Sequence, residues 1–139
     1  MTTVLDASAL LRFLDDEPGA EQVERLLNKA ASGDLTLLIS AVNWGEVVYA
    51  VAPRQGFDAA TQLLKKISSL RLTVVACTGE DAAEAAFFKE RFKVPYADAF
   101  AACLALQNSA PLITADYDFK TLPPGTLKIE FLPLKPKRP

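Results

Sequence analysis

Apolar positions along the chain follow two different spacings, and these spacings divide it into alternating elements. Short apolar runs that leave no room for a helix predict strands, whereas apolar residues spaced three and four apart predict amphipathic helices. The expected strands cover residues 2–5, 35–39, 72–76, 111–114 and 127–131. The expected helices cover residues 8–14, 20–31, 41–52, 57–69, 79–92 and 96–108.

Polar residues and breakers set the expected ends of these elements. Ser8 and Ser40 precede helical patterns, and serine is a favoured N-cap residue. Pro53 is expected to end the helix that begins after Ser40, because proline removes a backbone donor and clashes with the preceding turn. Gly33 is expected to terminate the helix over residues 20–31.

The order of elements predicts one α/β domain. Strands that alternate with helices are typical of a mostly parallel sheet with helices on both faces, and strands covered on both faces are nearly all apolar. No repeat and no linker to a second domain is visible. We therefore expect a domain over residues 1–132, followed by a loose tail rich in Pro and Lys over residues 133–139.

Composition narrows the class of protein. Of 139 residues, 50% are hydrophobic and 23% charged, which suits one compact domain with a sizeable core. The net charge of −2 excludes a generally basic, nucleic-acid-coating surface, so any nucleic acid must bind a local patch. Neither a signal peptide nor a membrane span is expected, which favours a cytoplasmic protein without a membrane partner.

Histidine is absent from the sequence. This excludes a histidine general base, a Ser-His-Asp triad, a Cys-His dyad and a His-ligated zinc site. Any chemistry must therefore use carboxylates, hydroxyls, Lys, Arg or a hard metal ion.

Four carboxylates lie inside apolar stretches that contain no Lys or Arg, at residues 4–11, 44–48, 96–100 and 112–116. Acids are rarely buried without a partner. Asp6 directly follows the first strand and Asp116 follows the fourth, and parallel sheets place their sites at the carboxyl ends of strands. Glu46 and Asp98 lie on neighbouring helices and can reach the same edge. Either distant cations pair with these acids, or the acids converge on a metal ion.

Convergence without a cation would be costly. Two unit charges about 4 Å apart repel by roughly 4 kcal/mol at an effective dielectric near 20. Mg²⁺ and Mn²⁺ prefer oxygen ligands, and they can activate water and stabilise charge on a phosphate. The acids therefore suit phosphodiester hydrolysis, which needs no histidine.

Four segments carry a family resemblance: VLDASALL at 4–11, SAVNWGEV at 40–47, YADAFAA at 96–102 and LITAD at 112–116. In this order they resemble the signature segments of PIN-domain nucleases, and the chain length is similar to that of VapC-type ribonuclease toxins of toxin–antitoxin pairs. The resemblance implies a PIN-like three-layer sandwich with a mostly parallel sheet of about five strands. It also implies an Mg²⁺- or Mn²⁺-dependent RNA endonuclease that leaves 5′-phosphate and 3′-hydroxyl ends by metal-activated water. As partners it implies an RNA substrate, a VapB-type antitoxin and a second copy of the chain.

The resemblance also assigns roles to residues. Asp6, Glu46, Asp98 and Asp116 would be catalytic and would hold one or two metal ions. Asp118 is a further candidate ligand, because the family uses one or both acids of such a pair. Ser8 and Thr114 would support the site by hydrogen bonds, and Asn43, one turn before Glu46, would line it.

Each of these acids also has a purely structural reading. Asp6 suits an N-cap, Asp98 a first helical turn and Asp116 an Asx-turn. Glu46 caps nothing, and its structural reading is an ion pair with a distant arginine such as Arg12.

Basic and aromatic side chains near these segments have two readings each. Four cations could contact RNA phosphates or remain ordinary solvated side chains: Arg12, Arg91, Lys93 and Lys120. The aromatic residues Phe13, Trp44 and Tyr49 are expected in the core or an interface rather than as platforms for bases.

Two other functions compete with the nuclease. One is a PIN-fold binding module that has lost catalysis, although all four acids are present. The other is a phosphotransfer enzyme resembling haloacid dehalogenase-like hydrolases, with an aspartyl-phosphate at Asp6. That mechanism needs a second acid two residues on, where this chain has Ser8.

Overall fold

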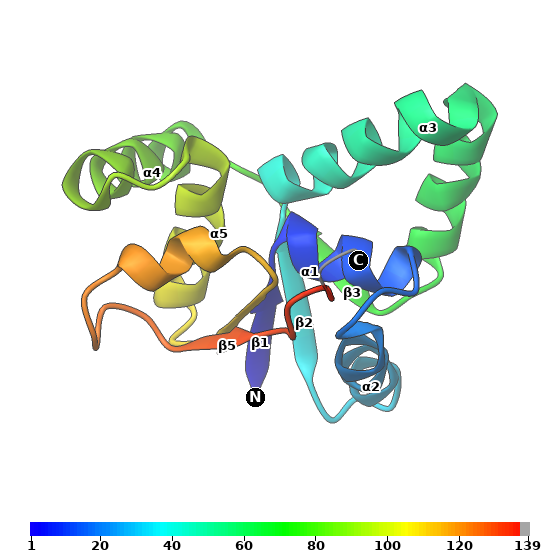
Figure 1. Ribbon diagram of the computed structural model, residues 1–139, viewed down its shortest axis with the longest axis horizontal. Coiled ribbons are helices and arrows are strands. Elements are labelled where there is room, and N and C mark those ends of the chain that lie inside the picture. Colours follow the sequence, from blue (N-terminus) through cyan, green and yellow to red (C-terminus); the bar gives the residue numbers. More distant parts are fainter. Residues whose placement is uncertain (137–139) are drawn as a thin grey trace.

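A five-stranded, all-parallel sheet forms the centre of the computed structural model, which describes residues 1–136 (Figure 1). The order across the sheet is β3-β2-β1-β4-β5, and every neighbouring pair is parallel. The strands are β1 (Thr2–Leu5), β2 (Thr36–Ser40), β3 (Leu72–Val75), β4 (Leu112–Thr114) and β5 (Ile129–Phe131). The expected strands and their parallel arrangement are confirmed.

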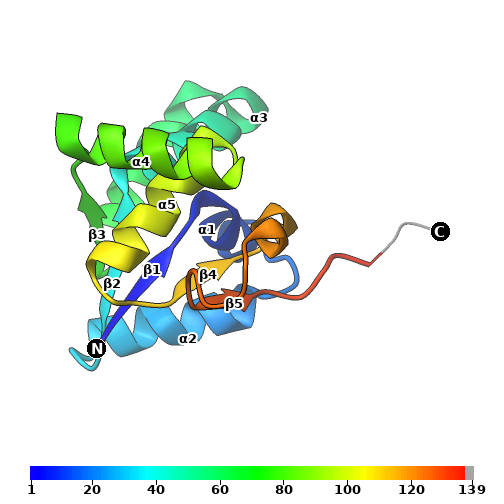
Figure 2. The ribbon, with the colours of Figure 1, turned by 90° about the vertical axis from the view of Figure 1, so that its left-hand side faces the viewer.

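Helices cover both faces of this sheet, as Figures 1 and 2 show. On one face lie α1 (Ala7–Leu14), α2 (Ala20–Ala31) and part of α3 (Ala41–Ser68); on the other lie α4 (Gly79–Phe92) and α5 (Tyr96–Gln107). Successive strand residues point to opposite faces. Val4, Leu38 and Leu112 therefore pack with α4 and α5, while their neighbours Leu5, Ile39 and Ile113 pack with α1, α2 and α3.

The strand order creates a switch point between β1 and β4. From β1 the chain builds β2 and then β3 toward one edge of the sheet, and later builds β4 and β5 toward the other. The connections that leave β1 and β4 consequently diverge at the carboxyl ends of these two strands. Open parallel sheets form their crevices at such points.

Two local expectations were wrong, and one further element was not expected. Asp6, not Ser8, is the N-cap of α1, because the Asp6 side chain accepts from the Ala9 N–H. Helix α3 continues past Pro53 and changes direction at Gly56, whose φ of 87° and ψ of 169° are not helical. Figure 1 shows the resulting bend between the two arms of α3. A 3₁₀ helix, η1 (Tyr117–Thr121), follows β4 and was not expected.

The segment after β5 is tied to the domain by Arg12. The Arg12 side chain donates to the carbonyls of Pro18 and Pro133, at 2.6 and 2.7 Å, and Lys135 pairs with Glu17. Of the expected tail over residues 133–139, residues 137–139 lie outside the described part of the chain. No helix within residues 1–136 is both long and apolar enough to cross a membrane.

Candidate acidic site

Asp6 lies at the carboxyl end of β1, almost completely buried at 3% exposure. Its Oδ1 accepts from the Ala9 N–H at 2.9 Å and from the Ser8 hydroxyl at 2.7 Å, and its Oδ2 accepts from the Thr114 hydroxyl. A carboxylate has about four acceptor positions. Three are used here, so Asp6 is firmly oriented and keeps capacity on Oδ2 for one further ligand.

Ser8 and Thr114 join the ends of β1 and β4. The Ser8 hydroxyl accepts from the Ala115 N–H, and the Thr114 hydroxyl accepts from the Asp116 N–H, both at 2.9 Å. These bonds attach the loop after β4 to the first turn of α1. The two hydroxyls therefore orient Asp6 and place Asp116 beside it.

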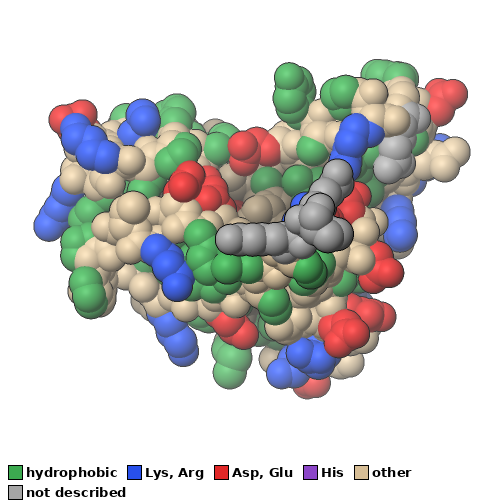
Figure 3. Space-filling view, in the orientation of Figure 1, with side chains coloured by type: hydrophobic (Ala, Val, Ile, Leu, Met, Phe, Trp, Pro, Cys, Tyr) green, Lys and Arg blue, Asp and Glu red, His purple; other side chains and the backbone are tan. Residues whose placement is uncertain are grey.

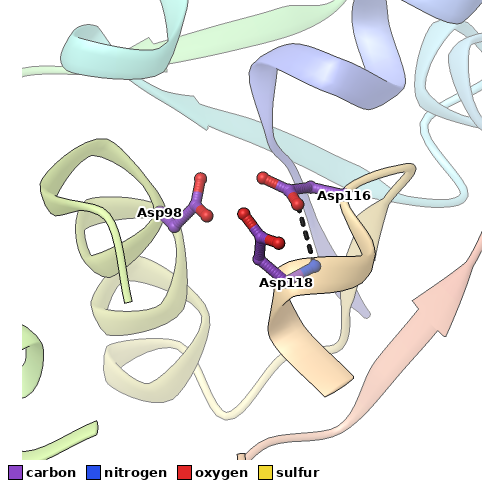
Figure 4. Close-up of side chains that lie close together, drawn as sticks. All are labelled: Asp98, Asp116 and Asp118. Carbon is purple, nitrogen blue, oxygen red and sulfur yellow. Dashed lines mark hydrogen bonds between the residues drawn. The ribbon is translucent and has the colours of Figure 1, made fainter. Parts of the chain in front are cut away.

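Asp98 approaches from the opposite side, on the first turn of α5. Figure 4 shows its carboxylate directed toward Asp116 and Asp118, which follow β4. One carboxylate oxygen from each of these three residues lies within 4.8 Å of the others. The Asp98 Oδ2 atom is enclosed, and within residues 1–136 it has no hydrogen-bond partner.

Asn43 orients the acid on α3. Its side-chain amide donates to Glu46 Oε1 at 3.2 Å and to the Ala97 carbonyl at 3.0 Å. The amide oxygen in turn accepts from the hydroxyl of Ser40, the N-cap of α3, at 3.0 Å. Asn43 thus links Glu46 to the backbone next to Asp98. Ser40 was expected only as a cap; its bond to the Asn43 amide oxygen is local, and the tertiary contact is the bond from Asn43 to the Ala97 carbonyl.

The four acids meet around one cavity of about 300 Å³, lined by Asp6, Glu46, Asp98 and Asp116 among others. No Lys or Arg is among its described lining residues. None of the ion pairs formed within residues 1–136 involves these acids or Asp118. In the space-filling view, acidic side chains flank a hollow on this face (Figure 3). Distant cations therefore do not neutralise the cluster in the described part of the chain.

The electrostatics of this arrangement favour protonation. Burial raises the pKa of Asp6 to about 6, an effect that its hydrogen bonds from Thr114, Ser8 and Ala9 oppose. Burial, and then the neighbouring Asp116 carboxyl, raise the pKa of Asp98 to about 8. Because the protein cannot keep these charges cheaply, a bound cation would be stabilising.

The structural readings of the acids hold in part alongside the clustering. Asp6 does cap α1, and Asp116 accepts from the Asp118 N–H at 2.9 Å, as in an Asx-turn. The suggested ion pair between Glu46 and Arg12 is wrong, because the Arg12 guanidinium donates to two carbonyls instead.

The four cations proposed for RNA do not line the cavity. Arg12 is only 8% exposed, and its role between Pro18 and Pro133 is structural, so the expectation that it contacts RNA does not fit. Arg91 lies over the Phe92 ring and Lys93 pairs with Glu90, both at the end of α4. Lys120 is exposed on η1 and lies over the rings of Tyr117 and Phe131.

Of the three aromatic residues, Phe13 and Trp44 pack partly buried against the core. Tyr49 does not: it is exposed and lines the acidic cavity. A core position for Tyr49 is therefore wrong, whereas the alternative expectation of an interface position stays a prediction. Its spacing of three residues from Glu46 was the available signal.

Sequence comparison identifies relatives along most of the chain. The PIN domain family model matches residues 3–123. VapC ribonuclease Mb0640 from Mycobacterium bovis is 30% identical over 124 residues, which cover 84% of this chain and 92% of that protein. Ribonuclease VapC30 from Mycobacterium tuberculosis matches with the same identity and coverage.

Solved structures share the fold at lower identity. The structure of VapBC2 from Rickettsia felis, bound to a DNA fragment from its promoter, has a TM-score of 0.75 at 19% identity and covers 96% of this chain and 100% of that chain. VapBC-1 from nontypeable Haemophilus influenzae has a TM-score of 0.70 at 19% identity, covering 94% and 98%. The parallel sheet, the acidic edge and the family match agree, and the chain belongs to the PIN-domain family.

Proposed function

We propose that this chain is a divalent-metal-dependent endoribonuclease and the toxin of a VapBC-type pair. The observation that carries the proposal is the group of carboxylates around one cavity with no cation among its described lining residues. The named ribonuclease relatives support the choice of RNA as substrate.

The donor set fits Mg²⁺ or Mn²⁺. Asp98, Asp116 and Asp118 each offer an oxygen within 4.8 Å of the others, and these ions prefer such ligands. The enclosed, unpartnered Oδ2 of Asp98 is the clearest sign, because a buried polar atom without a partner is costly. Asp6 and Glu46 would complete the site from across the cavity, directly or through water.

When bound, such an ion lowers the pKa of water and stabilises charge on a phosphate. The residues of the chain supply orientation. Ser8 and Thr114 hold Asp6 in one rotamer, and Asn43 directs Glu46 into the cavity. A scissile phosphate at this edge would therefore meet carboxylates that need no rearrangement, which is how preorganised sites lower barriers.

Cleavage of single-stranded RNA in the presence of Mn²⁺ tests the proposal. The wild-type chain should cleave, whereas EDTA or Asp6→Asn should lower the cleavage rate by about 100-fold or more. Asp58→Asn is the matched control, because Asp58 is an exposed acid on the second arm of α3. Equal cleavage in all four samples would contradict the metal mechanism.

The partner assignments are also proposals. The VapBC structures with the same fold support a small VapB-type antitoxin as the inhibitor, and half of the residues being hydrophobic supports a homodimer. Co-purification with the product of the adjacent reading frame, with loss of ribonuclease activity in the complex, is the expected result. Sedimentation of the toxin alone as only a 15 kDa species would contradict the dimer.

The alternative functions have less support. Both oxygens of Asp6 already accept hydrogen bonds, which suits a fixed ligand better than an attacking nucleophile. A binding module without catalysis has no need of five acids at one sheet edge.

A further inference from the structure

One exposed aromatic side chain stands at the wall of the acidic cavity. Tyr49 lies on α3 three residues after Glu46 and lines the cavity together with Glu46, Asp98 and Asp116. Residues three apart share a helix face, and the helix rises by about 4.5 Å between them. Tyr49 therefore lies about one helical turn from Glu46, on the wall of the same cavity.

The fold gives Tyr49 no stabilising role. It is 79% exposed, it belongs to neither core cluster, and within residues 1–136 its hydroxyl forms no hydrogen bond and its ring pairs with no other aromatic ring. Isolated exposed hydrophobic residues are common. The location distinguishes Tyr49, because the other exposed aromatic residues, Phe57, Phe87 and Tyr96, do not line this cavity.

The charge of the cavity limits how it can hold RNA. Its described wall contains four carboxylates and no Lys or Arg, so it repels a phosphate backbone unless a cation is bound. A neutral aromatic ring can hold the nucleotide by another route, since every base has a face that stacks on it. Stacking is nearly independent of net charge and of salt.

We propose that Tyr49 stacks on a nucleobase adjacent to the phosphate at the acidic site and is a substrate-binding residue. The proposal rests on the proposed ribonuclease function. It implies that the base at this position is unpaired, because a base within a duplex has no free face. RNA is favoured over a protein partner because the ring shares its cavity with the acids proposed for catalysis.

Binding of a labelled single-stranded RNA oligonucleotide, measured by fluorescence anisotropy with Mg²⁺, tests the proposal. The Asp6→Asn background prevents cleavage, and asparagine preserves the cap of α1. Adding Tyr49→Ala should weaken binding about 10-fold, whereas Tyr49→Phe and Tyr49→Trp should rescue it. The ratio of the dissociation constants with and without Tyr49→Ala should be the same at low and high salt. Loss of a phosphate contact would instead give a ratio that changes with salt. Phe57→Ala is the matched control, at 83% exposure on the same helix.

The outcomes separate this inference from the proposed function. If the wild-type chain cleaves RNA but Tyr49→Ala binds RNA as tightly as its background, the stacking role is wrong and the nuclease stands. If Phe57→Ala weakens binding equally, or Tyr49→Ala changes the sedimentation coefficient instead of RNA affinity, the stacking role is also wrong. If the wild-type chain neither binds nor cleaves RNA, both proposals fall.

Discussion

Asp6 and Asp98 are the same residue type on two sides of one cavity, yet their surroundings differ. On the strand side, Asp6 accepts three hydrogen bonds, caps α1 and is joined to β4 through Ser8 and Thr114. On the helix side, Asp98 has an enclosed Oδ2 without a partner in the described residues, and it faces Asp116. Burial disfavours both charges, but hydrogen bonds oppose this effect only at Asp6.

This difference teaches what each acid contributes to the fold. Asp6 serves the fold and the proposed site together, so its presence alone does not reveal function. Asp98 suits the first turn of α5, but its burial costs the fold free energy, and its enclosed Oδ2 forms no hydrogen bond within residues 1–136 in return. A residue of that kind is typical of functional sites, where local cost is offset elsewhere.

The largest expected effect is on activity, and it should be equal on the two sides. Asp6→Asn and Asp98→Asn should each lower the rate of RNA cleavage by about 100-fold or more, as when one preorganised electrostatic group is removed. Initial rates with Mn²⁺ measure this. Full activity of Asp98→Asn would show that only the strand side is catalytic.

Substitutions on the two sides should change the free energy of unfolding in opposite directions. Asp6→Ala removes a cap, worth roughly 1 kcal/mol, and leaves the Thr114 and Ser8 hydroxyls without their acceptor, so unfolding should cost about 2 kcal/mol less. Asp98→Asn removes a repelled charge and should stabilise the metal-free protein by about 1 kcal/mol, a value kept small because solvent screens this partly exposed group. Urea unfolding in EDTA at pH 8 gives both values. Destabilisation by Asp98→Asn would contradict the comparison.

A change of pH should reveal the free-energy cost of ionising these buried acids without a mutation. The pKa values of Asp6 and Asp98 are raised to about 6 and about 8, above the ordinary 3.8 of the unfolded chain. Between pH 4 and pH 8 the folded state therefore binds more protons, and stability falls as pH rises through this window. The midpoint temperature of thermal unfolding, measured in EDTA, should fall by a few degrees between pH 5 and pH 8. Added Mn²⁺ should raise this temperature more at pH 8 than at pH 5. A flat profile that Mn²⁺ does not alter would contradict the acidic metal site.

The smallest effect concerns the residue that connects Glu46 to the helix side. Asn43→Ala removes the bonds to Glu46 and to the Ala97 carbonyl but retains every carboxylate. Cleavage should fall about 10-fold, which is 1.4 kcal/mol of transition-state stabilisation. Higher Mn²⁺ should recover part of this loss, because Asn43 only positions a ligand. A loss as large as that of Asp6→Asn would mean that Asn43 contacts the substrate itself.

Strong local patterns made most of the fold predictable. The five apolar strands and the helices over residues 20–31 and 79–92 follow from periodicity, and their bounds agree with the structure to within a residue or two. The errors fall where local rules compete. Ser8 and Asp6 are both suitable N-cap residues by type. In the structure Asp6 is the N-cap of α1, and its carboxylate also accepts a hydrogen bond from Thr114 on β4. Pro53 lies within α3, and the change of direction occurs three residues later, at Gly56.

The candidate site was predictable for a different reason. Strand ends of a parallel sheet share an edge, so the positions of Asp6 and Asp116 after their strands already placed them together. The positions of the basic side chains could not be predicted in this way, because a long side chain can turn either toward a site or away from it. Arg12 lies only six residues from Asp6, but its guanidinium is directed to Pro18 and Pro133.

The sequence by itself limited the chemistry: without histidine, only carboxylates, hydroxyls, Lys, Arg or a hard metal ion remained, and the acids placed after strand ends favoured an acidic site. Only the tertiary structure decided the surroundings of each residue at the site. It satisfied Asp6 through a hydroxyl more than a hundred residues away, it left Asp98 Oδ2 without a partner in the described residues, and it placed Tyr49 on the cavity wall. The physical reason is that residue type follows from the chain, whereas burial and hydrogen-bond partners come from segments that meet only after folding.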